Sequence, residues 1–225
     1  MIDLDYFAPS NPLWIHSSRL IDKGKGIIAN YIFTGCKVEG TVKLNNLEFK
    51  VKGTGHHEHS WSPGFLQLSI KGWDWCYMVL DNGWSIYYGN YYLTRQILLP
   101  ATTRINPLAI IVVTNDKGTK MTKLENVDIT VEKFDKLFTL LKIPTNLGII
   151  ARPKILSQPL LKTYNIKLEL DIKTKNTYEK MWKFPTYVGM KVGLNSITGM
   201  VAWSEDGTQE MDLKGTGTFW FMRSF

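Results

Sequence analysis

The residues best suited to chemistry lie in one stretch of the chain, between Gly53 and Gly83. This stretch holds three of the 4 histidines and three of the 8 tryptophans, together with the acids Glu58 and Asp74. Protein interiors rarely combine so much aromatic surface with titratable groups unless something binds there. The stretch therefore predicts a binding pocket, although it does not name a reaction. Its residues are His56, His57, Glu58, His59, Trp61, Trp73, Asp74 and Trp75.

Alternation sorts these side chains onto separate faces. In an extended strand, successive side chains point to opposite sides. In the strand expected around 56–61, one face carries His57, His59 and Trp61, and the other carries His56, Glu58 and Ser60. In the strand expected from residue 73, one face carries Trp73, Trp75 and Tyr77, and the other carries Asp74 and Cys76. Two adjacent faces of this kind would line a cavity with aromatic side chains and one or two titratable groups.

The histidines allow three interpretations, of which the last two stay open. His57 and His59 have the spacing of a metal-chelating pair, but no further ligand lies at a partner spacing, so we predict no metal site. Either histidine could act in acid–base catalysis with Glu58 or Asp74. Alternatively, the group is a structural hydrogen-bond network that closes a corner of the fold.

Asp74 is the strongest single candidate for a catalytic acid because it lies between two tryptophans in an apolar strand. If its side chain points inward, burial would raise its pKa and leave a proton to donate. If it points outward, it is an ordinary surface acid. The sequence leaves both directions open.

The elements around this stretch read as short strands separated by turns. Aromatic residues make up 12% of the chain, and alternating strand-like runs are joined by turn sequences at Asn45-Asn46, at Asp81-Asn82-Gly83 and at 115–118. About ten strands follow one another, which indicates an all-β, antiparallel barrel or sandwich. No repeat or domain boundary interrupts the pattern, so we expect a single domain over 1–225, with an irregular N-terminal segment over 1–26.

Residues 132–162 break the strand rhythm. Phe134, Leu137, Phe138 and Leu141 follow helical spacing, and three prolines then punctuate an apolar, basic stretch. One interpretation is a short helix or loop around 133–160 that plugs one end of a barrel. The other is a lid, or a flap that makes peripheral contact with a membrane.

Composition narrows the classes of partner and compartment. The net charge of +7 is spread along strands, and no basic run or nucleic-acid motif is present, so nucleic acid is not an expected partner. Cys36 and Cys76 lie in separate apolar runs and read as buried free thiols. The N-terminus lacks signal-peptide features and no apolar run could span a bilayer, so we expect a soluble, cytoplasmic protein.

One motif resembles a known family. The signature G-x-G-[aromatic]-H-[DE]-H-x-W-G is similar to Gly53-Thr54-Gly55-His56-His57-Glu58-His59-Ser60-Trp61, with Ser62 in place of the closing glycine. A second signature, G-W-D-W followed by L-D-D-G, is similar to Gly72-Trp73-Asp74-Trp75 followed by Leu80-Asp81-Asn82-Gly83. Trp203 and the glycines of 215–217 match a C-terminal signature more loosely. The family is the lipocalin-like AttH and carotenoid hydratase (hydroxyneurosporene synthase) group, which also includes lipocalin-like Diels–Alderases.

The resemblance implies a lipocalin-like barrel that holds an apolar, isoprenoid- or lipid-like molecule without a cofactor. In the hydratase branch an acid protonates a double bond and water adds; in the cyclase branch the cavity folds the substrate. A non-catalytic carrier stays an alternative. Members carry two lipocalin-like halves, and this chain has the length of one, so a homodimer or a separate second half is an expected partner. The implied catalytic residues are Asp74, His57, His59 and Glu58, and the implied ligand-binding residues are Trp61, Trp73, Trp75, Tyr77, Tyr88 and Trp203.

Overall fold

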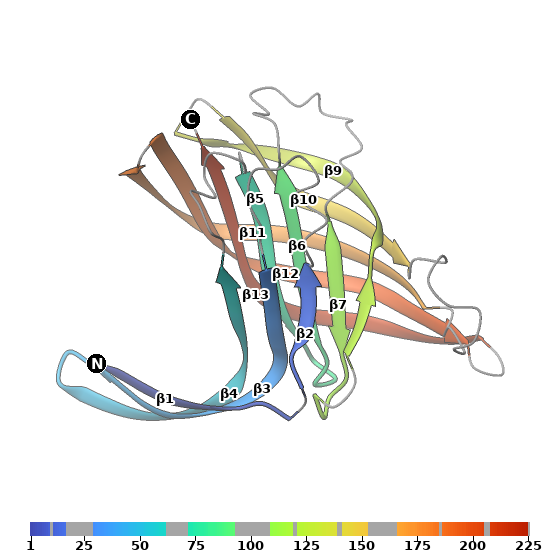
Figure 1. The fold of residues 1–225 in the computed structure, drawn as a ribbon, viewed down its shortest axis with the longest axis horizontal. Helices are drawn as coiled ribbons and strands as arrows, with labels where there is room; N and C mark the ends of the chain where they lie inside the picture. The colour runs from blue at the N-terminus through green and yellow to red at the C-terminus, as the bar shows by residue number, and fades with distance from the viewer. Residues whose placement is uncertain are drawn as a thin grey trace.

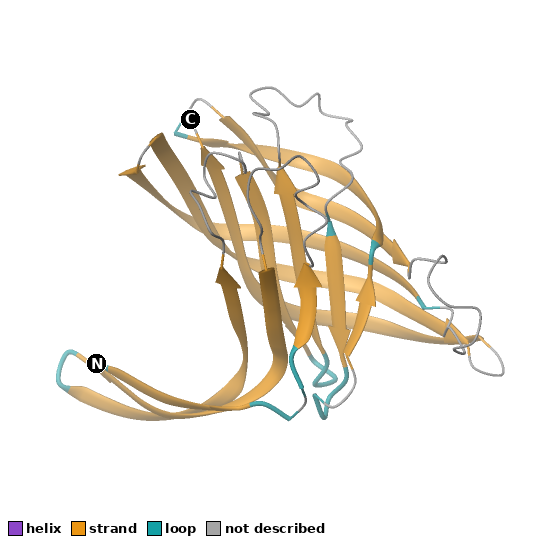
Figure 2. Ribbon diagram, viewed as in Figure 1, coloured by secondary structure: helices purple, strands orange, loops and turns teal. Residues whose placement is uncertain are grey.

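All regular structure in the described part of the chain is β-strand. The computed structural model describes residues 1–9, 11–16, 29–61, 72–92, 109–118, 121–138, 141–152, 166–184, 186–204 and 208–224. Figure 2 shows strands and connecting loops in these residues and no helix. The expected all-β, antiparallel class is confirmed. No helix in these ranges is long and apolar enough to cross a membrane.

The strands form two antiparallel sheets, one of four strands and one of nine. The four-stranded sheet contains β1 (Ile2–Phe7), β2 (Leu13–His16), β3 (Ala29–Leu44) and β4 (Leu47–Trp61). The nine-stranded sheet contains β5 (Gly72–Leu80), β6 (Ser85–Tyr92), β7 (Ile110–Thr114), β8 (Met121–Leu124), β9 (Asn126–Leu137), β10 (Leu141–Arg152), β11 (Lys167–Phe184), β12 (Thr186–Ser204) and β13 (Thr208–Ser224).

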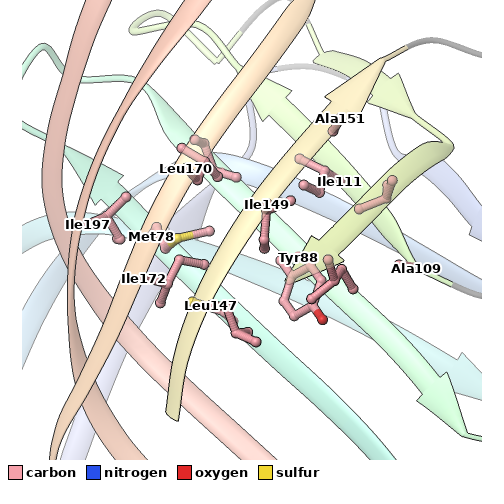
Figure 3. Packing of buried hydrophobic residues seen from close by; sticks show 14 of the residues in the cluster. Met78, Tyr88, Ala109, Ile111, Leu147, Ile149, Ala151, Leu170, Ile172 and Ile197 are labelled. Carbon is pink, nitrogen blue, oxygen red and sulfur yellow. The ribbon is translucent and has the colours of Figure 1, made fainter. Parts of the chain in front are cut away.

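The nine-stranded sheet curls around the main hydrophobic core (Figure 1). Its order is β8-β7-β6-β5-β13-β12-β11-β10-β9, so most neighbouring strands are consecutive in sequence. The exception is β13, the last strand, which pairs with β5, the first strand of this sheet. Alternate side chains of each strand point to the inside, because a strand shows one face to the core at every second residue. Figure 3 shows this packing, with Met78, Tyr88 and Ile149 directed toward one another from three strands.

The four-stranded sheet covers part of the outer face of the nine-stranded sheet. Tyr87, Ile110 and Val112 point away from the main core and are buried against Ile15 and Ile32 of the smaller sheet. This second cluster explains why β6 and β7 are apolar on both faces. A strand that is covered on both sides loses the alternation of polar and apolar residues.

β3 and β4 bend where they leave this contact. Gly35 has a φ of 69°, and a Cβ there would lie 3.2 Å from the Gly118 Cα, so only glycine suits the position. The register between the two strands shifts at the same point, between Phe33 and Cys36. The Tyr77 hydroxyl stabilises the bend by donating a hydrogen bond to the Gly55 carbonyl oxygen at 2.9 Å. Beyond it, β1 and the far halves of β3 and β4 extend away from the larger sheet (Figure 1).

The expected turns are present. Asn45 and Asn46 have positive φ angles of 47° and 65° between β3 and β4. Gly83 and Gly118, with φ of 84° and 66°, lie in the turns after β5 and β7. Asparagine and glycine tolerate this backbone region better than other residues, which is why these turns could be read from the sequence.

Two expectations for irregular segments are wrong. The N-terminal segment, expected to be irregular, contains β1 and β2, because Ile2 to Phe7 pair with β3. The stretch from 133 to 152, expected to be a helix or loop plug, is a hairpin of β9 and β10; residues 153–165 lie outside the described ranges. The apolar residues with helical spacing span the turn of this hairpin: Phe134 and Leu137 lie on β9, Phe138 follows with a φ of 48°, and Leu141 begins β10.

Candidate functional site

A pocket of about 460 Å³ lies where β4 faces the outer side of β5, β6 and β13. It is therefore between the two sheets, on the opposite side of β5 from the main core. Its lining residues are His56, Glu58, Ser60, Trp73, Asp74, Trp75, Gly89, Asn90, Tyr91 and Trp220.

Strand register assembles the aromatic wall. Trp75 of β5 is paired with Gly89 of β6 on one side and with Trp220 of β13 on the other. The Trp75 and Trp220 rings meet edge to face, with centroids 5.8 Å apart. Gly89 lines the pocket beside Trp75, and a Cβ there would lie 3.1 Å from the Tyr87 hydroxyl oxygen. The pocket thus offers flat apolar surface with room next to it.

Glu58 is held in place on the β4 wall of the pocket. Its carboxylate accepts hydrogen bonds from the Trp75 indole N–H at 2.9 Å, the Asn30 side-chain amide at 2.6 Å and the Ser60 hydroxyl at 3.1 Å. These donors come from three different strands, so the carboxylate is oriented by the fold rather than by its own flexibility. Such fixed acceptors set the orientation of a ligand.

His56 lies among aromatic rings on the same wall. Its ring centroid is 4.7 Å from that of Trp75 and 4.5 Å from that of Tyr77. Burial lowers the pKa of His56 to about 4, and the neighbouring His57 adds a smaller effect in the same direction. At neutral pH the imidazole is therefore uncharged and able to accept a proton.

His57 and His59 point to the other side of β4. Both are exposed, and His59 stacks on Tyr31 with ring centroids 5.5 Å apart. The alternation expected from the sequence places them away from Glu58, Trp73 and Trp75. The structure consequently brings Glu58 and His56 together at the pocket and leaves the other two histidines on the opposite face.

Asp74 points into the core of the nine-stranded sheet. It is fully buried, and its carboxylate lies 2.7 Å from Arg223 Nη1. The Tyr92 hydroxyl donates a hydrogen bond to it, and the Arg223 guanidinium stacks 4.3 Å from the centroid of the Tyr92 ring. The inward direction is one of the two considered from the sequence. The Arg223 guanidinium makes the Asp74 carboxylate part of a buried ion pair inside the core, away from the β4 wall of the pocket.

The other expected ligand-binding residues have varied positions. Tyr77 supports the bend of β3 and β4, and Tyr88 is fully buried in the main core. Trp61 and Trp203 lie at the ends of β4 and β12, and their side chains are outside the described residues. In the described ranges, no group of three or more His, Cys, Asp or Glu side chains could hold a metal ion.

Several pocket residues were not singled out as site residues from the sequence. Alternation already placed His56 and Ser60 beside Glu58, so that signal was available. No sequence signal points to Tyr91 and Trp220, because they reach the pocket only through the pairing of β5 with β6 and β13.

Comparison with solved structures agrees with this arrangement of strands. Kievitone hydratase from Nectria haematococca is similar over 99% of this chain and 61% of its own, with a TM-score of 0.59 and 8% identity. The fold of this chain is lipocalin-like. A protein assigned as AttH from Nitrosomonas europaea is similar over 97% of this chain and 59% of its own (TM-score 0.56, 14% identity). CghA in complex with Sch210972 is similar over 87% of this chain and 55% of its own (TM-score 0.52, 12% identity).

These likenesses concern the fold. The resemblance to the lipocalin-like AttH and hydratase group is confirmed at that level, and this chain spans 55–61% of the length of the three structures. No protein-family profile matches the chain, and no curated protein matches it in sequence.

Proposed function

We propose that the lipocalin-like chain binds an apolar, isoprenoid- or lipid-like small molecule in the pocket between β4 and β5. The observation that carries the proposal is the pocket itself, whose volume of about 460 Å³ combines a wall of Trp73, Trp75 and Trp220 with His56 and Glu58. Ligand sites of roughly 300–1,000 Å³ with apolar walls and a few convergent polar groups are the usual form of small-molecule sites.

The polar groups suit proton transfer to and from such a ligand. A proton from solvent that adds to a carbon–carbon double bond leaves a carbocation, which the faces of nearby indole rings stabilise, and the proton that His56 later accepts returns to solvent. The uncharged His56 imidazole can then accept a proton, either from an adding water (hydration) or from an adjacent carbon (isomerisation). Cyclisation would instead use the shape of the pocket. The name of the structurally similar kievitone hydratase supports chemistry of the hydratase type.

Binding is tested by titrating the purified chain with a panel of polyenes and isoprenoid alcohols while recording tryptophan fluorescence. The Trp220→Ala variant should lose about tenfold in affinity, because it removes one wall of the pocket. Tyr178→Ala, which truncates an exposed aromatic residue of β11, is the matched control and should bind normally. Absence of binding by the whole panel, or equal affinity in both variants, would contradict the proposal.

Catalysis and simple carriage are distinguished by following the bound molecule. Incubation in ¹⁸O-labelled water, followed by mass spectrometry, should show a ligand heavier by one labelled water or an isomer of unchanged mass. His56→Phe should abolish the change while retaining binding. A ligand recovered unchanged from the wild-type protein, and transferred between vesicles by it, would establish the alternative, a lipid carrier with peripheral membrane contact.

A further inference from the structure

The part of the four-stranded sheet that extends beyond the bend has one apolar face. We call this part the arm: β1 with residues 37–44 of β3 and 47–54 of β4, which pair with each other. Alternation and register place apolar side chains of all three strands on the same side. They are Ile2, Leu4, Tyr6, Val38, Val42, Leu44, Leu47, Phe49 and Val51.

The opposite face of the arm is charged. Its side chains include both acids and bases, and two of the cross-strand contacts are ion pairs, Lys43–Glu48 at 2.7 Å and Lys52–Glu39 at 3.0 Å. The arm is therefore an amphipathic antiparallel sheet. Sheets of this kind normally pack their apolar face against another layer of the protein.

In this structure the apolar face of the arm is open. The exposed fractions are 70% for Ile2, 51% for Tyr6, 62% for Leu44, 62% for Leu47 and 47% for Phe49. Contiguous apolar patches of this kind on soluble proteins usually mark interaction sites.

The apolar face continues past the bend as an aromatic ladder. Phe33 lies next to Tyr31, with ring centroids 5.8 Å apart, and Tyr31 next to Trp14 at 5.7 Å. His57 and His59, which stand away from the candidate pocket, lie against the same tyrosine. Because β3 and β4 turn away from the nine-stranded sheet, this face lies on the inner side of the bend.

The outer strand of the same sheet also has an unused edge. β4 is 15 residues long and, among the described elements, pairs only with β3. Long edge strands present unpaired backbone groups that readily join another strand. Among the described residues, the arm therefore has an exposed apolar face, and β4 has no strand along its second edge.

We propose that the apolar face of the arm binds the same face of a second copy of this chain, related by a two-fold axis. A self-complementary patch is what such an interface requires. The exposed apolar side chains of one arm present roughly 600 Å², since large aromatic side chains offer about 150–250 Å² each. Two arms would bury roughly 1,200 Å², and the aromatic ladder adds to this, which reaches the range of stable interfaces.

The charges of the arm favour this occupant over a membrane. Binding to an anionic bilayer needs an excess of lysine and arginine beside the apolar face. The charged face of the arm instead alternates Lys37, Lys43, Lys50 and Lys52 with Asp3, Asp5, Glu39 and Glu48. Two facing four-stranded sheets would contain eight strands, a number that can close around an interior filled by side chains.

The oligomeric state of the full chain at micromolar concentration tests the proposal, measured by sedimentation velocity. Wild type should be a dimer, and Phe49→Glu should be a monomer with its dissociation constant raised by about 100-fold or more, because the new charge would be buried without a partner. Lys50→Glu is the matched control. It introduces the same charge at the next residue, on the opposite face, and should remain dimeric.

Cross-linking provides a readout that does not depend on the strength of association. Phe49→Cys should give a covalent dimer with a short bifunctional maleimide, whereas Lys50→Cys should not, because residue 50 lies on the opposite face of the arm. The two native cysteines are buried and should not react. A monomeric wild type, a Phe49→Glu variant that stays dimeric, or equal cross-linking at both positions would each overturn the proposal. Wild type that floats with anionic vesicles while remaining monomeric would also overturn it.

Discussion

Asp74 illustrates how a single partner changes the chemistry of a residue. Between two tryptophans a carboxyl group could serve as an acid, but the Arg223 guanidinium 2.7 Å away makes it half of a buried ion pair. Breaking such a pair leaves an uncompensated charge in the core. We therefore expect Arg223→Met to lower the free energy of unfolding by about 3–5 kcal/mol, measured by urea denaturation.

The double variant Asp74→Leu, Arg223→Met is the control for that prediction. Replacing both charges by apolar side chains of similar size is often neutral, so the double variant should recover most of the lost stability. A double variant that is as unstable as the sum of the two single variants would show that the pair is not coupled.

His56 should make stability depend on pH. Its folded pKa of about 4 lies below the ordinary histidine pKa of 6.5, so between these values the unfolded chain binds a proton that the folded chain does not. The contribution of His56 is thus complete above about pH 6.5 and is lost as the pH falls toward 4, with an upper limit of about 3 kcal/mol. Urea denaturation at several pH values measures this.

The comparison for this prediction is His56→Gln, which cannot titrate. Its stability should change less than that of wild type over the same pH range. The imidazole proton signals in NMR should report the same group directly. A His56 signal that titrates near pH 6.5 in the folded protein would contradict the prediction.

At the scale of residues, the sequence was sufficient to sort side chains within a strand but not to join strands. Alternation correctly separated His56 and Glu58 from His57 and His59. Arg223 and Trp220 could not be anticipated, since they approach β5 only through its pairing with β13, far along the chain. Local patterns carry no information about such partners.

At the scale of elements, β1 depends on a close approach at Gly40. A Cβ at this position would lie 2.1 Å from the Asp3 carbonyl oxygen, which is backbone and has little freedom to move. Gly40→Ala should therefore detach β1 from β3. Hydrogen exchange of residues 2–7, followed by mass spectrometry, should rise to the rate of an unprotected segment.

Gly53→Ala provides a matched control for Gly40→Ala. It lies in β4 of the same arm, and an added Cβ there meets no atom within 4 Å. Exchange in β1 should be unchanged. If both variants exchange alike, the close approach at Gly40 is not what holds β1 in place.

The reading of elements succeeded where turn residues punctuate the chain and failed where register shifts. Asn45-Asn46 and Asp81-Asn82-Gly83 predicted hairpins because few residues accept a positive φ. The β9–β10 hairpin has helical spacing from Phe134 to Leu141 because these residues span its turn, where the alternation of a strand is interrupted. β1 was missed although Ile2, Leu4 and Tyr6 alternate with acids, because its partner strand begins only after a long interval.

For the molecule as a whole, Cys36 and Cys76 report on global unfolding. Both are free and buried, and burial raises the pKa of both thiols, which keeps them in the unreactive protonated form. A thiol reagent should label neither in native buffer and should label both at the urea concentration where the circular dichroism signal is lost. An exposed cysteine introduced by Lys50→Cys should react at once. Rapid labelling of wild type without urea would contradict the prediction.

The pairing of β5 with β13 has a consequence for how the protein is made. All other neighbours in the nine-stranded sheet follow one another closely in sequence, so they can form while the chain is still being synthesised. The β5–β13 pair joins strands that lie far apart in the sequence and closes a very large loop, so we expect it to form later than the other pairs. Because Trp75 and Trp220 meet across this pair, we expect the complete pocket to appear only after β5 and β13 have paired.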